Sequence, residues 1–127
     1  MTVTNTGSGE PPTPAIDAHC PYYAAAMDLL SRRWAGAVLR ALITGSMRFR
    51  DLAATIPGIT DRMLSQRLKD LEAAGLVDRI VHPSTPVQIE YRLTDKGLAL
   101  GGVLLHLNQW ALEWITLPDK QSGDPDR

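Results

Sequence analysis

Residues 45–97 read GSMRFRDLAATIPGITDRMLSQRLKDLEAAGLVDRIVHPSTPVQIEYRLTDKG, and the order of patterns in this stretch decides the fold. A short amphipathic run, a Pro57-Gly58 break and a longer run with leucines on one side predict two helices joined by a tight turn. Two β-rich runs follow, over residues 77–81 and 89–93, around a proline-bounded loop. We therefore expect a helix-turn-helix followed by a β-hairpin wing, an arrangement that places its second helix in the DNA major groove.

Helices are also predicted on both sides of this stretch, so the expected fold is mainly α with a small β-hairpin wing (α+β). Pro21 should begin the first helix, because proline already has the φ that the first helical position needs. Thr60 is the predicted N-cap of the second helix of the pair, and Gly75 is its predicted stop. We expect helices over residues 21–30, 34–43, 48–56, 61–74 and 94–114.

Length and composition indicate one soluble globular domain. The chain has 127 residues, of which 44% are hydrophobic and 21% charged. The polar stretches 1–17 and 118–127 are predicted to be disordered tails, which leaves a winged helix-turn-helix domain with dimerisation helices over residues 18–117. No apolar run is long enough to span a bilayer, and the N-terminus lacks the basic start and apolar core of a signal peptide. The single cysteine excludes an intramolecular disulfide framework, which fits a reducing cytoplasm. Together with the absence of an apolar span, it leads us to expect a cytoplasmic protein with no membrane partner.

Charge is distributed unevenly along the chain. The net charge is -1, yet residues 31–92 hold ten Arg and Lys against six Asp and Glu, a local balance of +4. Phosphate binding depends on the local potential more than on the total charge. The basic middle of the chain therefore permits nucleic-acid binding.

The polar face of the helix predicted over residues 61–74 carries the main candidate DNA contacts. Its leucines form one core stripe, and Arg62, Ser65, Gln66 and Lys69 lie on the other side. Arg and Gln can read base edges, whereas Ser and Lys suit phosphates. A solvated surface helix would also be polar on one side, but the short helix before it and the wing after it favour DNA binding. The full candidate set is Arg48, Thr60, Asp61, Arg62, Ser65, Gln66, Lys69, His82, Ser84 and Thr85.

Four segments in this order resemble the HxlR-type winged-helix transcription regulators, relatives of the MarR group: CPYYAAAMDLLSRRW (20–34), RFRDLAATIPGIT (48–60), MLSQRLKDLEAAGLVDR (63–79) and PVQIEYRLTDKG (86–97). A Trp-bearing terminal helix follows them. The resemblance covers about residues 20–114 and implies a bacterial or archaeal homodimer that binds pseudo-palindromic, double-stranded operator DNA. The family pattern usually carries an arginine in the wing just before the second strand. Here Gln88 takes that place after Val87, which leaves His82, Ser84 and Thr85 for backbone contact.

Cys20 has two interpretations. A free cysteine is often a small buried apolar side chain. Alternatively, Pro21 makes Cys20 the predicted N-cap of a helix, where the helix dipole favours the thiolate form. The resemblance places Cys20 at the N-terminal cysteine that several members use to sense quinones, aldehydes or hypochlorite. An oxidant or another small-molecule effector is therefore a second expected partner, acting through an adduct or a bridge between the Cys20 residues of two subunits.

The terminal helix is apolar on more than one side, which predicts a dimer face in addition to a core face. The helix that begins at Pro21 is its expected partner in a symmetric dimer. The predicted interface residues are Tyr22, Tyr23, Met27, Leu104, Leu107, Trp110 and Trp114.

Signals of enzymatic chemistry are weak. His19, His82 and His106 are scattered, zinc has no cysteine pair, and Gly101-Gly102 is not a phosphate loop. We therefore expect no enzymatic activity, no metal and no cofactor. The alternative to a DNA-binding regulator is a winged-helix module that binds protein instead of DNA, since a fold does not fix a function.

Overall fold

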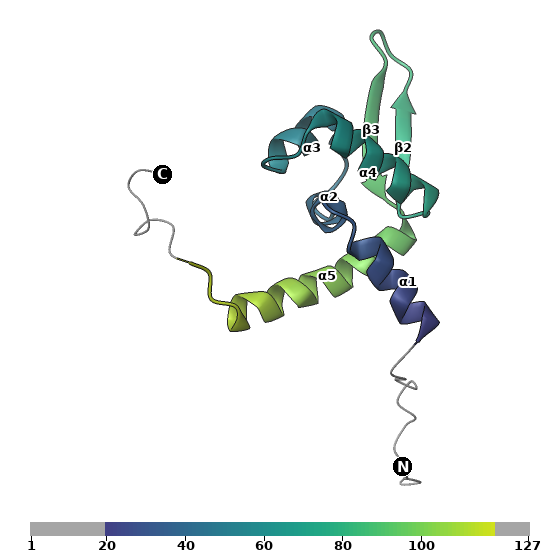
Figure 1. Ribbon diagram of the computed structural model, residues 1–127. Coiled ribbons are helices and arrows are strands. Elements are labelled where there is room, and N and C mark those ends of the chain that lie inside the picture. The colour runs from purple at the N-terminus through teal and green to yellow at the C-terminus, as the bar shows by residue number, and fades with distance from the viewer. Residues whose placement is uncertain (1–19, 119–127) are drawn as a thin grey trace, which may run out of the picture. The chain divides into compact units, whose positions relative to one another are not determined.

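The computed structural model describes residues 20–118 (Figure 1), and the chain divides into two units between Arg32 and Arg33. The first unit contains α1 (Pro21–Leu30). The second contains the remaining elements: α2 (Ala35–Leu42), β1 (Met47–Arg48), α3 (Phe49–Thr55), α4 (Asp61–Ala73), β2 (Val77–His82), β3 (Gln88–Leu93) and α5 (Asp95–Trp114). The predicted tails, 1–17 and 118–127, lie outside the described residues except for Pro118.

Helix α1 begins at Pro21, as predicted, with Cys20 in the N-cap position. The Cys20 side chain makes no capping hydrogen bond. At the other end the Ser31 hydroxyl donates to the Asp28 carbonyl oxygen at 3.1 Å, and the Ser31 amide donates to that of Met27 at 2.8 Å. None of the residues in α1 is buried.

Helices α3 and α4 form the predicted helix-turn-helix, and both predicted signals at the ends of α4 are confirmed. The Met63 amide donates to Thr60 Oγ1 at 3.1 Å, so Thr60 caps the start of α4. At its end Gly75 has a φ of +77°, a left-handed conformation that glycine adopts without strain. The helix stops at Ala73, with Ala74 as its C-cap.

The sheet has the order β1-β3-β2 and is antiparallel throughout. Strands β2 and β3 form the predicted wing, a hairpin that projects beside α4, with Val77 opposite Leu93 at its base (Figure 1). Strand β1 was not predicted. Arg48, which we expected to start a helix, instead pairs with Glu90 of β3, and α3 begins one residue later. This pairing depends on the edge of β3, which lies far along the chain from Arg48. The residues around Arg48 therefore do not predict it.

Helix α2 starts one residue later than predicted because of Trp34. This residue has a φ of +75°, a left-handed conformation that does not continue a helix. The Arg33 guanidinium lies 4.8 Å from the centre of the Trp34 ring, within the range of a cation–π contact. The far edge of the ring reaches the turn between α3 and α4, since a Cβ added at Gly58 would lie 3.5 Å from Trp34 Cη2.

The core of the second unit gathers around α2, which packs against α3, α4, α5 and β3. Each fully buried leucine contributes about 1.5–3 kcal/mol relative to an exposed one. The buried hydrophobic residues are Ala35, Val38, Leu39, Ala41, Leu42, Leu52, Ile56, Leu64, Leu68, Leu71, Leu76, Val77, Leu93 and Leu104. The predicted fold, a mainly helical winged helix-turn-helix, is confirmed.

Helix α5 contributes little to this core. Thr94 Oγ1 accepts a hydrogen bond from the Gly97 amide at 3.0 Å and so caps its start. Only Gly97, Gly101 and Leu104 of its residues are buried. Within residues 20–118, no helix combines the length and the apolar character that crossing a membrane requires.

Candidate nucleic-acid interface

Helix α4 presents three of the predicted contact residues on its exposed side. Its buried residues are Leu64, Leu68 and Leu71, which confirms the predicted core stripe. Arg62, Gln66 and Lys69 are exposed, and their spacing of four and three residues places them on one face of the helix. Ser65 is half-buried beside them. The exposed residues of α4 therefore include two cations and one amide, together with the carboxylates of Asp61 and Glu72.

Two of these side chains are free to meet an anion. Neither Arg62 nor Lys69 takes part in a hydrogen bond or an ion pair within residues 20–118. A long cationic side chain without an internal partner can neutralise a phosphate without first breaking a contact of its own.

Gln66, in contrast, has a partner on its own helix. Its Nε2 donates to Asp70 Oδ1 at 3.0 Å, while Asp70 Oδ2 pairs with the Arg67 guanidinium. A bidentate contact with adenine uses both the oxygen and the nitrogen of the amide, so Gln66 must leave Asp70 to make one. This interaction was not predicted, although a glutamine and an aspartate four residues apart on a helix are a recognisable signal for it.

Three further predicted contact residues, Thr60, Asp61 and Arg48, lie at the start of α4 or before it. Thr60 Oγ1 accepts the Met63 amide, which leaves the hydroxyl hydrogen of Thr60 available to donate. Asp61 is exposed in the first turn, where a carboxylate stabilises the helix through its dipole. Arg48 is exposed too, but it lies in β1, beside the wing strand β3 and outside the helix-turn-helix.

The wing carries His82, Ser84 and Thr85 at and beyond the end of β2, and all three are exposed. His82 Nε2 lies 3.2 Å from Glu90 Oε1, a diagonal contact across the hairpin. The Ser84 hydroxyl donates to the Pro86 carbonyl oxygen at 2.7 Å, and the Thr85–Pro86 peptide is cis. Within residues 20–118, the Thr85 hydroxyl makes no hydrogen bond, whereas that of Ser84 is engaged by the Pro86 carbonyl.

The residues predicted for a dimer face do not share one environment. Leu104 is only 9% exposed and belongs to the core of the second unit. Trp110 and Trp114 are 53% and 70% exposed, and Tyr22, Tyr23, Met27 and Leu107 are also exposed. Six further apolar residues on or after α5 are exposed but were not among the predicted interface residues: Leu98, Val103, Leu105, Leu112, Ile115 and Leu117.

Cys20 is a free thiol and is half-buried. It stands at the N-cap of α1, where its carbonyl oxygen accepts the Ala24 amide at 2.9 Å and its side chain makes no capping hydrogen bond. The thiol is therefore partly accessible, unlike a fully buried core cysteine. Within residues 20–118, no three side chains of His, Cys, Asp or Glu come together in a group that could hold a metal ion.

Comparison with known proteins places these features in context. The model of the HxlR-like helix-turn-helix family matches residues 29–119. The HTH-type transcriptional regulator YvaP of Bacillus subtilis is 49% identical over 96 residues, which are 76% of this chain and 89% of YvaP. The HTH-type transcriptional regulator YodB of the same organism is 44% identical over 92 residues, 72% of this chain and 82% of YodB.

Solved structures agree with the sequence comparison. The reduced form of YodB superposes with a TM-score of 0.70 at 40% identity, covering 80% of this chain and 99% of YodB. A quinone-bound form of YodB superposes at 0.65 with 38% identity, covering 75% and 100%. The oxidised form of the redox regulator HypR superposes at 0.71 with 33% identity, covering 77% of this chain and 100% of HypR.

Proposed function

Because the chain belongs to the HxlR-like helix-turn-helix family of transcriptional regulators, we propose that it binds a specific DNA operator as a homodimer. The observation that carries this proposal is the exposed face of α4, where Arg62, Gln66 and Lys69 stand opposite the buried leucines. In a helix-turn-helix the second helix lies in the major groove, and its first residues read base edges. Arg62 and Gln66 then contact bases, and Lys69 contacts a phosphate.

The wing supplies contacts to the DNA backbone in this proposal. His82, Ser84 and Thr85 are exposed at the end of the hairpin that projects beside α4. Gln88, in the place of the arginine usual in this pattern, is half-buried and pairs with His82 in the strand register. We therefore assign the wing a role in phosphate binding and none in inserting a cation into the minor groove.

Homodimerisation is supported by the exposed apolar side chains of α5. A soluble chain rarely leaves a series of large apolar residues uncovered unless a partner covers them. A second copy of the chain covers these residues in a symmetric dimer. The twofold axis of such a dimer matches the symmetry of a pseudo-palindromic DNA site. The side chains that we assign to this interface are Tyr22, Tyr23, Met27, Leu107, Trp110 and Trp114, whereas Leu104 serves the core.

Two alanine variants of α4 test base reading. Gln66→Ala should change the preferred base at one position of each half-site, because a lost bidentate contact removes about 1–3 kcal/mol of discrimination. Lys69→Ala should weaken binding to all sequences alike and reduce the salt slope by about one unit. The measurement is selection from a random duplex pool, followed by titrations at several salt concentrations.

Each of these variants serves as the control for the other. Gln66→Ala should keep the wild-type salt slope, and Lys69→Ala should keep the wild-type base preference. If both variants match the wild type in affinity and preference, the face of α4 does not read DNA. That result would favour the alternative function, a winged-helix module that binds protein instead of DNA.

We propose in addition that an oxidant or a quinone controls binding through Cys20. The support is the half-buried thiol at the start of α1 and the likeness to YodB, solved in a quinone-bound form, and to HypR, solved in an oxidised form. Addition of the thiol to a quinone forms one C–S bond, and the thiol proton passes to the ring, which becomes a hydroquinone. The adduct adds bulk at a helix that we assign to the dimer interface.

A paired titration with and without a quinone tests this control. We expect the quinone to lower the affinity of the wild type for its selected DNA by about 5- to 150-fold, the usual range of coupling between sites. Cys20→Ser should bind equally well in both conditions, since it cannot form the adduct. Mass spectrometry checks that the wild type carries one adduct. If labelled wild-type protein binds DNA as tightly as before, the thiol is structural.

A further inference from the structure

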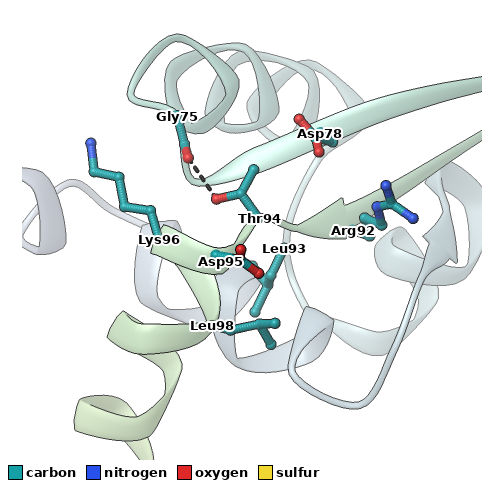
Figure 2. A pocket seen from close by; sticks show the side chains of 8 residues that line it. All are labelled: Gly75, Asp78, Arg92, Leu93, Thr94, Asp95, Lys96 and Leu98. Atoms are coloured by element: carbon teal, nitrogen blue, oxygen red, sulfur yellow. Dashed lines mark hydrogen bonds between the residues drawn. The ribbon is translucent and has the colours of Figure 1, made fainter.

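The three consecutive backbone carbonyls that follow the last residue of α4 all accept hydrogen bonds from two residues at the start of α5. Lys96 Nζ donates to the Ala74 carbonyl oxygen at 2.6 Å, and the Thr94 hydroxyl donates to that of Gly75 at 2.6 Å. The Thr94 amide donates to the Leu76 carbonyl oxygen at 3.0 Å. Figure 2 shows Thr94 and Lys96 extending from the start of α5 toward the end of α4, with the Thr94–Gly75 bond dashed.

These carbonyls face α5 because of the way α4 ends. The Gly75 amide donates to the Glu72 carbonyl oxygen at 3.0 Å, and the Leu76 amide to that of Leu71 at 2.9 Å. This pair of bonds, with Gly75 at a φ of +77°, is a Schellman motif. It turns the chain out of the helix and leaves the next carbonyls without partners inside α4. The negative end of the helix dipole lies here too, so the Lys96 ammonium is favoured by charge as well.

The joint between the end of α4 and the start of α5 is made of close contacts. The hydroxyl of Thr94 serves both helices, since it donates to Gly75 of the α4 end and accepts the Gly97 amide of the α5 start. Gly97 itself lies against the Leu76 carbonyl, because a Cβ added there would be 2.2 Å from the Leu76 oxygen. A small rotation of α5 must therefore move the end of α4 with it.

We propose that Lys96 is a positioning residue that fixes the recognition helix α4 relative to α5. This inference rests on the proposed function, in which α4 reads DNA and α5 joins the two subunits. The spacing of two recognition helices in a dimer then depends on the angle between α4 and α5 in each subunit. Lys96 affects selective binding because its hydrogen bond to the Ala74 carbonyl holds the end of α4 in place. It contacts neither a base nor a phosphate.

Lys96→Met isolates this role, because the methionine keeps an unbranched apolar side chain and loses the donor. Lys96 is exposed, so the variant should fold. Lys96→Arg restores a cationic donor. Arg92→Met is the matched control, since Arg92 is an exposed cation that lines the same pocket without a bond to the end of α4 (Figure 2).

The probes are the tightest duplex that the wild type selects from a random pool and a scrambled duplex of the same length. We expect Lys96→Met to lose about tenfold affinity for the selected duplex, within the range seen for coupling residues that contact neither ligand. Its affinity for the scrambled duplex and its salt slope should stay at the wild-type values. Lys96→Arg should recover most of the loss, and Arg92→Met should keep the wild-type ratio between the two duplexes.

Two results overturn the positioning role while DNA binding stands. Equal losses on both duplexes with a reduced salt slope would make Lys96 a phosphate contact. Wild-type affinity for both duplexes, with only a lower melting temperature, would make it a stabilising residue and nothing more.

Amide hydrogen exchange tests the joint without DNA. In Lys96→Met the amides of Ala74, Gly75 and Leu76 should exchange faster, while those of α2 keep their wild-type rates. Unchanged exchange at these three amides would overturn the inference whatever the DNA results are. If the wild type binds both duplexes equally, the proposed function fails, and the exchange rates alone decide whether Lys96 holds the end of α4.

Discussion

Gly97→Ala should destabilise the fold more than an alanine at either of the other two glycines of α5, Gly101 and Gly102. The added Cβ would lie 2.2 Å from the Leu76 carbonyl oxygen and 3.2 Å from Leu93 Cβ. The oxygen cannot withdraw freely, because it accepts the Thr94 amide at 3.0 Å. Overpacking and a weakened buried hydrogen bond together should lower the free energy of unfolding by about 3 kcal/mol or more, a drop in melting temperature on the order of 15 °C.

Two neighbouring glycines of the same helix provide graded controls. A Cβ at Gly101 would lie 3.1 Å from Ile43 Cγ1, a side-chain atom that can move, so the net change should be within about 1 kcal/mol. A Cβ at Gly102 meets nothing within 4 Å, so Gly102→Ala should stabilise the helix by about 0.5–1 kcal/mol. Urea unfolding of the three variants at one protein concentration measures this order. A Gly97→Ala protein as stable as the wild type would refute the close contact.

The sequence revealed those features of the fold that depend on neighbouring residues. Thr60 as a cap and Gly75 as a stop follow from local backbone requirements, and the structure confirms both. The hairpin followed from two β-rich runs with a turn between them. The buried stripe of α4 followed from leucines at helical spacing.

The features that sequence reasoning missed depend on distant residues. Arg48 looked like the start of a helix, yet it pairs with Glu90, which is 42 positions along the chain. Gly97 looked like part of an ordinary helix start, and its need to be glycine comes from the Leu76 carbonyl that lies against it. Trp34 looked helical, and nothing in its neighbours indicated the left-handed backbone that it adopts.

The candidate site shows the same division. The predicted face of α4 is exposed as expected, because periodicity separates its two sides. Periodicity does not report that Asp70 holds the Gln66 amide, although a search of pairs four residues apart finds it. It also treats Leu104 and Leu107 alike, whereas only the first is buried by the rest of the second unit.

Trp110→Asp should abolish selective binding to the operator if α5 joins two subunits as proposed. Trp110 is 53% exposed, and large aromatic residues often dominate the energy of an interface. A buried carboxylate without a partner is strongly unfavourable, so the variant should be a monomer. A monomer binds one half-site only. It loses the gain from binding two half-sites with two linked subunits, which is commonly about 10²–10⁴ in affinity. Sedimentation gives the assembly state, and titration of the selected duplex gives the affinity.

The matched control is Trp110→Phe, which keeps an apolar ring and should remain dimeric with nearly wild-type affinity. Trp110→Asp should keep its helical circular dichroism, because Trp110 is not one of the buried core residues and is already 53% exposed. A dimer should space its recognition helices by about 34 Å, so selected sites should show half-sites about 10–10.5 bp apart. A wild type that sediments as a monomer at micromolar concentration would contradict the dimer. Wild-type operator affinity in a monomeric Trp110→Asp would separate DNA reading from dimerisation and leave α5 to another partner.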